Sequence, residues 1–457
     1  MRRKGLMCWM KIGVLILAAG VARAGDVTCS LSTPLGGKGK ADSVRAVRIL
    51  EDGSFLVGAN VPAGTSLGGE VIRGNGDMIG VALRIRAGSM PEIETVHALP
   101  GPVKDMALDG SGRPCFAVGR AGLVRFTSDL NGFVHIEDVG PAERIDASQN
   151  GHVVVLGKEK LTLVSSRGEV VSRFSGHHRT KDLCIHGLSR TIIFVGFRNA
   201  NAYDGTKTRP VQIAYARATD YEGKVKWTNY DWSTEREAED FLNSPTNNMA
   251  DTRGYRCTIG GDGHLYMAFE AAGGNHIFRF SPQDISERID IVGGGAYHEF
   301  YNSAAEHKTV FGRYDPSTGN CLKIQQFCGR LSSGRANAVR VKEGEIWADG
   351  RGRTYLVGTF AYGIPLSFHP PGTGDYRGGG FLLVMSRNFS ERLYCTRFQG
   401  GKAPAHTVHS RSTDGVLTIA FGGSGLVSEK PYYAVNPLQE GREEDGYVAV
   451  LRAKGWN

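Results

Sequence analysis

Apolar and polar residues alternate along most of the chain, in short runs that end at turns rich in Gly, Asp and Asn. One unit, a turn followed by an apolar strand, occurs seven times: "EDGSFLVGA", "DGSGRPCFAVGR", "SQNGHVVVLGK", "LSRTIIFVGF", "GGDGHLYMAFE", "DGRGRTYLVGTF" and "STDGVLTIAFGG". Each unit precedes a second alternating strand, a tight turn and a third strand, as in "LVRFTSDLNGFVHIED". The pattern predicts antiparallel sheets of three or four strands.

Such a sheet cannot bury both of its faces alone, but sheets repeated around a ring cover one another. We therefore expect an all-β fold, a single β-propeller domain over residues 25–457, with seven blades preferred. The long interval before "TYLVGTF" contains an additional hairpin, "TVFGRYDPSTGNCLKIQQFCG", so an eighth blade stays open. Helical periodicity occurs once, in "STEREAEDFLN", and predicts a helical insertion over 231–247.

The C-terminal part of the chain resembles a known repeat. "WADGRGRTYLVGTF", "GGGFLLVMSRNFS" and "ERLYCTRFQGG" follow one another, and "TDGVLTIAFGG" with "EDGYVAVLRAKG" forms a partial second copy. Over residues 336–457 this order is similar to the SBBP-type repeat, the seven-bladed β-propeller repeat of secreted bacterial proteins. Trp347, Gly379 and Gly380 depart from its pattern. The resemblance implies a propeller exported by a bacterium.

The last strand of the chain, in "DGYVAVLRAKG", has no following strand, and an unpaired strand leaves an exposed edge. The segment "VTCSLSTPLGG", residues 27–37, is similar to "LYCTRFQGG", which closes the preceding repeat. We expect residues 25–37 to form the closing strand, with residues 27–32 antiparallel to 446–452. The alternative is that residues 27–37 are a disordered tail.

Residues 1–24 have the features of a signal peptide: a basic start, the apolar run "IGVLILAAGV", and Ala22-Arg23-Ala24 as a cleavage site. We therefore predict an exported protein, periplasmic or extracellular, and a monomer. No later run is long and apolar enough for a membrane span. The net charge of +8 falls to +3 without the signal, because 54 − 5 = 49 basic residues then face 46 acidic ones. This charge argues against binding to nucleic acid.

No motif predicts a metal or a cofactor. Beyond Cys8, the cysteines number seven, are widely scattered and lack the spacing of a zinc site, so we expect buried thiols and at most one or two disulfides. "ATDYEGKVKW", residues 218–227, is similar to the docking motif of quinoprotein propellers, but it occurs once. A hairpin turn whose Asp bonds its own backbone is the preferred interpretation. We predict no cofactor, and no catalytic residue can be named.

Three stretches combine Arg, Asp, His, Tyr and Asn most densely: 247–257, 270–276 and 293–301. We expect them to form loops that meet on one face of the ring, as ligand sites of propellers do. The predicted binding residues are Asp251, Arg253, Tyr255, His276 and His298. A structural Arg–Asp pair that only holds a loop is the competing interpretation.

Two functions remain open on the sequence alone. One is a secreted, non-catalytic binding module that presents loops to a protein or glycan ligand. The alternative is a secreted carbohydrate-active enzyme, a lyase or a glycoside hydrolase, with its site at the mouth of the channel. The lack of a recognisable catalytic motif favours the binding module, although propeller enzymes can collect acids from different blades.

Overall fold

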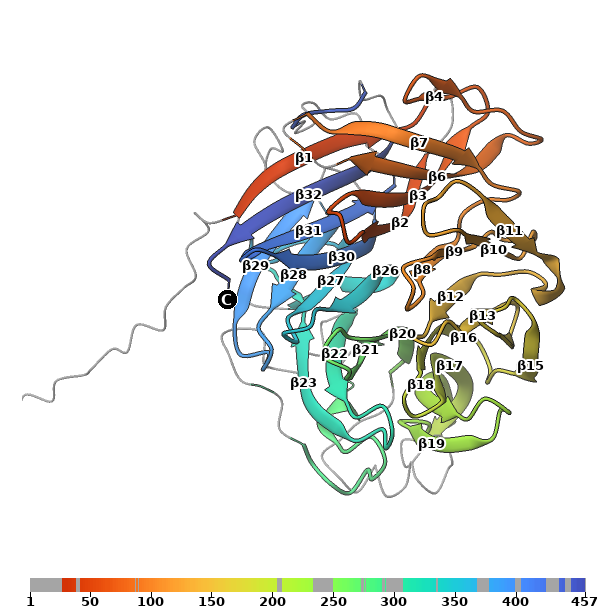
Figure 1. The fold of residues 1–457 in the computed structure, drawn as a ribbon. Coiled ribbons are helices and arrows are strands. Elements are labelled where there is room, and N and C mark those ends of the chain that lie inside the picture. Colours follow the sequence, from red (N-terminus) through yellow and green to blue (C-terminus); the bar gives the residue numbers. More distant parts are fainter. Residues whose placement is uncertain are drawn as a thin grey trace, which may run out of the picture.

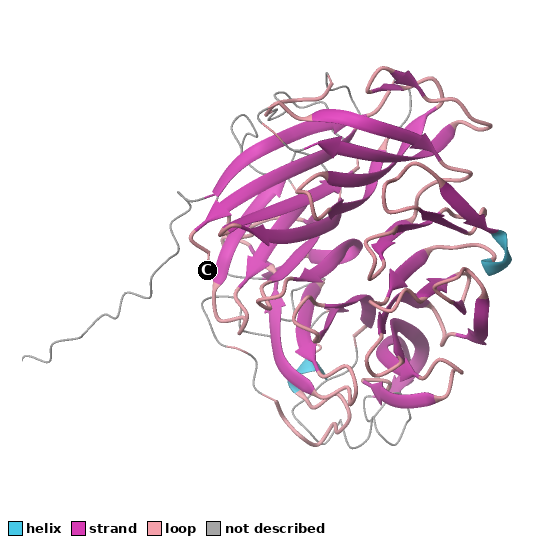
Figure 2. Ribbon diagram, viewed as in Figure 1, coloured by secondary structure: helices cyan, strands magenta, loops and turns pink. Residues whose placement is uncertain are grey.

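The computed structural model shows seven four-stranded antiparallel sheets arranged as blades around a central channel (Figure 1). The structure describes residues 27–37, 42–86, 88, 90–203, 208–232, 250–272, 275, 277–289, 292, 307–333, 336–367, 378–398, 404–424, 435–439 and 445–456. Strands dominate the described residues, and Figure 2 shows only two short helical turns, η2 (Glu137–Val139) and η3 (Ile277–Arg279). The prediction of an all-β propeller is confirmed, and the blade number is seven.

In every blade the first strand faces the channel. From inner to outer strand, blade 1 contains β2 (Ser43–Ile49), β3 (Phe55–Pro62), β6 (Met78–Arg86) and β7 (Glu92–Ala98). Blade 2 contains β8 (Asp105–Leu108), β9 (Pro114–Ala117), β10 (Leu123–Phe126) and β11 (Phe133–Ile136). Blade 3 contains β12 (Arg144–Ala147), β13 (Val153–Leu156), β14 (Lys160–Val164) and β15 (Val170–Ser175). Blade 4 contains β16 (Thr180–His186), β17 (Thr191–Tyr203), β18 (Thr208–Thr219) and β19 (Val225–Asn229).

The remaining blades follow the same order. Blade 5 contains β20 (Thr252–Ile259), β21 (Leu265–Ala271), β22 (Lys308–Tyr314) and β23 (Cys321–Phe327). Blade 6 contains β26 (Val339–Ala348), β27 (Thr354–Phe360), β28 (Gly379–Met385) and β29 (Arg392–Phe398). Blade 7 contains β30 (Ala405–Thr413), β31 (Val416–Gly423), β32 (Gly446–Lys454) and β1 (Val27–Leu35). Two small hairpins, β4 (Ser66–Leu67) with β5 (Glu70–Val71) and β24 (Gly329–Arg330) with β25 (Ala336–Asn337), lie outside the blades.

The antiparallel order gives the ring two different faces. We call the loop face the side where each inner strand begins, which carries the connections between blades and between second and third strands. The turn face is the opposite side, which carries the turns between first and second and between third and fourth strands. All seven turn units of the sequence lie on the turn face and lead into the second strand of a blade. The hairpin at 309–329 supplies β22 and β23, so the eighth blade is excluded and this hairpin completes blade 5.

Asp and Gly form the turns on the turn face for a local reason. Asp109 Oδ1 accepts hydrogen bonds from the backbone N–H of Ser111 and Arg113 at 2.9 and 3.0 Å, and Gly112 adopts a φ of 75° that favours glycine. Asp349 holds the equivalent turn of blade 6 in the same way. In "ATDYEGKVKW", Asp220 likewise accepts from the N–H of Glu222 and Lys224, as the turn interpretation expects.

The N-terminal strand closes the ring, as predicted. Val27 to Leu35 pair antiparallel with Gly446 to Ala453, with a bulge between Cys29 and Leu31. The outer edge of β1 is covered in turn, because the N–H and C=O of Ser32 each bond to Val435. Figure 1 shows β1 and β32, from opposite ends of the chain, side by side. The last strand of the chain therefore has its partner.

The hydrophobic core lies between neighbouring blades. Val57 and Val81 of blade 1, for example, pack in one cluster with Val448 and Val450 of β32. All seven cysteines from Cys29 onward are free thiols, and most are buried, as expected. The predicted signal peptide (1–24) and helical insertion (231–247) lie outside the described residues, apart from the two residues 231 and 232.

A ring of hydrogen bonds joins the inner strands all the way round the channel. In each blade, one polar side chain of the inner strand bonds to the backbone of the next inner strand. The pairs are Arg48 with Met106, Asp105 with Ile145, Asp146 with Ile185, Asp182 with Cys257, Arg256 with Gly344, Glu345 with Val408 and His409 with Ile49. We call these seven side chains the girdle. Each of them bonds the backbone of the next blade, so they act first as the structural link between blades.

Candidate functional site

The predicted residues Asp251, Arg253 and Tyr255 lie together where β20 begins on the loop face. Only Asp251 precedes the strand, so the expectation of a loop over 247–257 is wrong for residues 252–257, which pair with β21. Polar residues had suggested a loop, but β20 tolerates them because it borders the channel and has a bulge between Gly254 and Arg256. His276 and His298 lie outside the described residues.

Two of the three predicted stretches meet in the structure. The N–H of Ala272 donates to the carbonyl of Asp251 at 2.9 Å, and Asn275 Nδ2 donates to the carbonyl of Ala250 at 2.7 Å. These contacts place the described ends of 247–257 and 270–276 at one end of blade 5. The third stretch, 293–301, lies outside the described residues, so the meeting of all three stays a prediction.

Glu270, at the end of β21, organises a group of charges at this point. Its side chain is 3% exposed, and it forms ion pairs with Arg253, with His307 at 2.9 Å and with Arg340 at 3.5 Å. Burial opposes its ionisation, but His307 and the two arginines outweigh burial and lower the pKa of this carboxyl. Asp251 also pairs with Arg253. The structural Arg–Asp pair considered from the sequence is therefore present, and it extends into a network.

An excess of positive charge borders this network. The ring of Phe197 on β17 has three cations near it: Lys181 Nζ at 5.4 Å, Arg179 Cζ at 5.6 Å and Arg253 Cζ at 5.9 Å from its centroid. Burial, followed by the charges of Arg179, Lys342 and Arg256, lowers the pKa of Lys181. Four or more positive charges thus lie close enough to repel one another.

Three of these cations form no side-chain ion pair among the described residues, although Glu159 lies beside them: its Oε1 accepts from the backbone N–H of Arg179 at 3.2 Å, and its charge acts against the lowering of the pKa of Lys181. Among the ion pairs of the described residues, none includes Arg179, Lys181 or Lys342. Arg179 also has a φ of 48°, in the left-handed region that an arginine rarely adopts. Lys181 is the extra residue of a bulge between Thr180 and Asp182, and Lys342 lies in an irregular stretch of β26 between Arg340 and Glu345. We call Arg179, Lys181 and Lys342 the cationic rim.

Nearby aromatic groups do not offer a reactive side chain. Tyr255 is 4% exposed, its ring packs edge-on against Phe197 with centroids 6.3 Å apart, and burial raises the pKa of its hydroxyl to about 12. The hydroxyl therefore stays protonated at neutral pH. Tyr255 packs beneath the rim against Phe197, and its direct contact with a ligand stays a prediction.

A cavity of about 550 Å³ lies at the other end of the channel, on the turn face. All seven blades contribute to its lining, with Arg48, Leu108, Asp146, His186, Thr258, Trp347 and His409 as examples from each. The rings of Trp347 and His409 lie with centroids 4.4 Å apart. A volume of this size suits a small molecule. The sequence did not predict this cavity, because its residues come from turns and strand ends with no shared motif.

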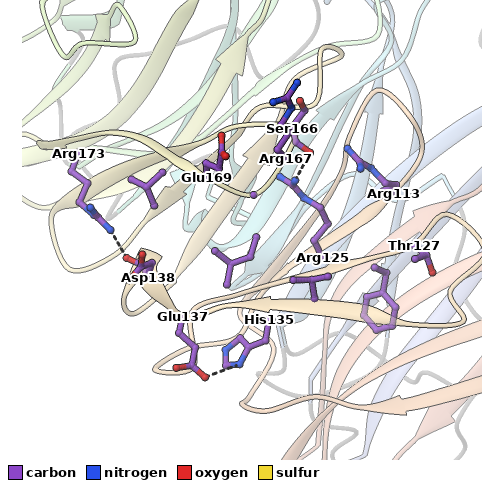
Figure 3. Close-up of a pocket in the computed structure, with 15 residues that line it drawn as sticks. Arg113, Arg125, Thr127, His135, Glu137, Asp138, Ser166, Arg167, Glu169 and Arg173 are labelled. Carbon is purple, nitrogen blue, oxygen red and sulfur yellow. Dashed lines mark hydrogen bonds and ion pairs between the residues drawn. The ribbon is translucent and has the colours of Figure 1, made fainter.

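A larger groove, of about 970 Å³, lies between the outer parts of blades 2 and 3 and is drawn in Figure 3. Arg125 Nη1 donates to the carbonyls of Ser165 and Ser166 at 3.2 and 2.9 Å, and Arg173 donates to the carbonyl of Asp138 at 2.6 Å. These two arginines join one blade to the next. The groove is therefore an interblade seam that these two arginines hold together.

The described residues contain no group of three or more His, Cys, Asp or Glu side chains arranged for a metal ion. Within the same part of the chain, no helix is both long and apolar enough to cross a bilayer. The site that remains is the loop-face mouth of the channel, with its buried Glu270 network and its cationic rim.

No protein-family model matches the chain, and no curated protein matches it either. Among solved structures, the WD40 β-propeller domain of Doa1 is similar, with 11% identity, a TM-score of 0.45, and coverage of 93% of this chain and 96% of that one. Selenomethionine-substituted virginiamycin B lyase from Staphylococcus aureus has 11% identity, a TM-score of 0.45 and coverage of 93% and 99%. A catalytically inactive form of that lyase with quinupristin has 10% identity, a TM-score of 0.45 and coverage of 92% and 98%. At these identities the likeness concerns the propeller fold alone.

Proposed function

We propose that this protein is an exported, non-catalytic binding module that holds an acidic glycan at the loop-face mouth of its channel. The observation that carries the proposal is the cationic rim: Arg179, Lys181 and Lys342 form no ion pair among the described residues, and burial, followed by repulsion from Arg179 and Lys342, lowers the pKa of Lys181. A ligand with carboxylate or sulfate groups would relieve this repulsion and form charge-assisted hydrogen bonds.

The residues of the rim favour a glycan over a protein partner. Stable protein interfaces have an apolar, aromatic-rich centre with charges at the edge. Here the aromatic residues of the site, Phe197 and Tyr255, are buried beneath the cations, at 6% and 4% exposure. The accessible groups are long, cationic side chains, which suit a ligand that carries repeated anionic groups and few apolar ones.

The acids beside the rim support binding without catalysis. Glu270 and Asp251 both pair with Arg253, and the lowered pKa of Glu270 keeps it ionised at neutral pH. A general acid needs the opposite, a carboxyl that retains its proton. A rigid ring with preformed side-chain positions also reduces the entropy lost on binding.

Export is part of the proposal and rests on the pattern of residues 1–24. Cleavage after Ala24 would leave β1 intact, since its first residue is Val27. Expression in a bacterium with fractionation and N-terminal sequencing tests this part. We expect a mature chain that begins at Gly25 outside the cytoplasm, and an uncleaved cytoplasmic chain would refute it.

Binding is tested by calorimetric titration of the chain from residue 25 with oligogalacturonate. The fully methyl-esterified oligomer is the matched neutral control, because it keeps the sugar and loses the charge. We expect binding of the acidic oligomer only, weaker at higher salt. The double variant Lys181→Ala, Lys342→Ala should bind roughly tenfold more weakly or worse, equivalent to about 1.4 kcal/mol. Lys224→Ala, an exposed lysine in a hairpin turn on the turn face, should bind as the unmodified chain does.

Equal affinity for both oligomers, or no effect of the double variant, would overturn the assignment of the rim. Polyglutamate serves as a third ligand, and tighter binding of this peptide than of the oligosaccharide would replace the glycan by an acidic protein segment. The reaction mixtures are also assayed for new reducing ends and for unsaturated sugars. Either product would show the hydrolase or lyase alternative to be right.

A further inference from the structure

The cavity on the turn face has a chemistry of its own. We propose that it binds an organic cation, a small molecule with a protonated amine and an apolar ring, whose ammonium group pairs with Asp146 while its ring lies against Trp347. This site would act in addition to the loop-face site: it lies at the other end of the channel, and it selects the opposite charge.

The charge of the lining supports a cation. Four ionisable side chains line the cavity: Arg48, Asp146, His186 and His409. Arg48 is already satisfied, since its Nη atoms donate to the carbonyls of Val47 and Met106 at 2.8 and 2.9 Å and pair with Glu345 at 3.0 Å. Its positive charge is therefore neutralised within the girdle.

The two histidines are neutral. The N–H of Ile49 donates to His409 Nδ1 at 3.2 Å, so this nitrogen is an acceptor and the ring proton is on Nε2. His186 Nδ1 lies 2.7 Å from the hydroxyl of Ser189. Burial is the main cause that lowers the pKa of both imidazoles. Neither ring supplies a positive charge to the cavity at neutral pH.

Asp146 is the remaining charge. Its Oδ2 accepts a hydrogen bond from the N–H of Ile185 at 2.9 Å, and no ion pair among the described residues includes it. Burial raises the pKa of its carboxyl to about 7; Arg48 on β2 favours the ionised form, and Asp105 on β8 opposes it. From β16 and β20, Cys184 and Cys257 also face it, and Asp182 and Arg256 line the same small cavity deeper in the channel. The carboxyl lacks a counter-ion, and a ligand ammonium would supply one.

The walls of the cavity suit the apolar part of such a ligand. Trp347 already has the guanidinium of Arg48 6.0 Å from its ring, which shows that the indole lies in a position where it can attract a cation. Ile259, from the blade next to that of Trp347, also lines the cavity, and Leu188 at its edge is 90% exposed. A ligand whose apolar part covers Leu188 would gain affinity from burial of this side chain.

Ionisation of Asp146 links binding to pH. An ammonium ligand binds the carboxylate form, and a primary amine keeps its proton up to about pH 9. Because the pKa of Asp146 is about 7, the ionised fraction rises roughly 25-fold between about pH 5.5 and 7.5. The affinity should rise by the same factor over that range, and a neutral ligand of the same shape should show no such change.

The test is a calorimetric titration of the chain from residue 25 with benzylamine, at about pH 5.5, 6.5 and 7.5. Benzyl alcohol is the matched probe, because it keeps the ring and loses the charge. Asp146→Asn keeps an oxygen that accepts from Ile185 but removes the charge, and should abolish both binding and its pH dependence. Glu169→Gln, which removes an exposed carboxylate from the same blade and face outside this cavity, is the control and should bind as the unmodified chain does.

We expect benzylamine to bind at least tenfold more tightly than benzyl alcohol at about pH 7.5. Equal affinities of the two probes, an affinity of benzylamine that stays flat with pH, or undiminished binding to Asp146→Asn would each overturn the proposal. If Asp146→Asn does not fold, the comparison of the two probes across pH on the unmodified chain still shows whether the cavity selects a cation. Neither probe carries an anionic group, so a failure of benzylamine to bind would not count against the proposed glycan site on the loop face.

Discussion

Removing the closing strand should unfold the ring. The perturbation is deletion of residues 25–36 from the chain that begins at residue 25, which removes the whole of β1. This strand contributes eight residue pairs to the ladder with β32. Leu31 and Leu35 are each 1% exposed and pack in the core between blades 7 and 1. Without β1, the edge of β32 and the apolar surface beneath these leucines would face solvent.

The magnitude follows from those contacts. A ladder of this length has about eight hydrogen bonds at about 1 kcal/mol net each. Burial of each leucine adds about 2 kcal/mol. The total, roughly 12 kcal/mol as an upper estimate, is comparable with the whole unfolding free energy of an ordinary domain, about 5–15 kcal/mol. The truncated chain should therefore have little stable folded population, and its exposed edge should promote association.

Urea unfolding followed by tryptophan fluorescence measures the effect, with light scattering to detect association. The deletion should abolish the cooperative transition or move its midpoint far down. A synthetic peptide of residues 25–37, added in trans, should restore the transition by taking the place of β1. A peptide with Leu31 and Leu35 both changed to Ala is the control and should restore much less. An unchanged midpoint in the truncated chain would refute the reasoning that β1 holds the ring closed.

Three further predictions concern the girdle and the buried groups. The pKa of His406 is lowered to about 3 by burial, so below about pH 6.5 the unfolded chain binds a proton that the folded chain does not, and stability falls as pH falls. Urea unfolding measures the loss of unfolding free energy between about pH 7 and 5. In His406→Gln this loss should be about 2 kcal/mol smaller than in the unmodified chain, because the variant lacks the buried imidazole. In His178→Gln, at an exposed site, the loss should equal that of the unmodified chain. Glu345→Ala removes the acceptor of Val408 N–H and the ion-pair partner of Arg48. It should lower the unfolding free energy by about 3–5 kcal/mol, and Glu345→Gln should lower it by less. Equal losses in the two variants would show that the charge of Glu345 is unimportant. The native chain, treated with iodoacetamide near pH 8, should remain unlabelled at its buried cysteines, since burial raises the pKa of these thiols. Unfolding in urea should expose all of them to labelling, which mass spectrometry detects. Rapid labelling of the native chain would contradict the burial.

Local sequence determined most of the architecture. The seven turn units proved to be the turns that lead into the second strand of each blade. In six of them a glycine adopts a positive φ, and in units such as that of Asp109 the carboxylate also bonds the following backbone, so the turn is specified without distant help; in the blade 4 unit Arg190 takes the positive φ instead. The closing strand could also be predicted, since its resemblance to an earlier outer strand and the unpaired last strand are both visible in the sequence. Blade 5 was harder, because a long connection separates β21 from β22, and the hairpin of β22 and β23 looked like a separate unit.

The functional surfaces depended on the tertiary structure. Lys181 and Lys342 are separated by 161 residues (342 − 181) and come from different blades, yet ring closure brings their charges together. Asp251 and Arg253 are near each other in the sequence, so their pairing could be considered from it. The sequence could not show that Glu270 also pairs with Arg253 or that residues 252–257 form a strand. Nothing in the sequence around Asp146 indicated a binding site, because its neighbours are ordinary strand residues. Its raised pKa results from the low-dielectric channel and from charges on other blades, and both exist only after seven sheets have closed around one axis.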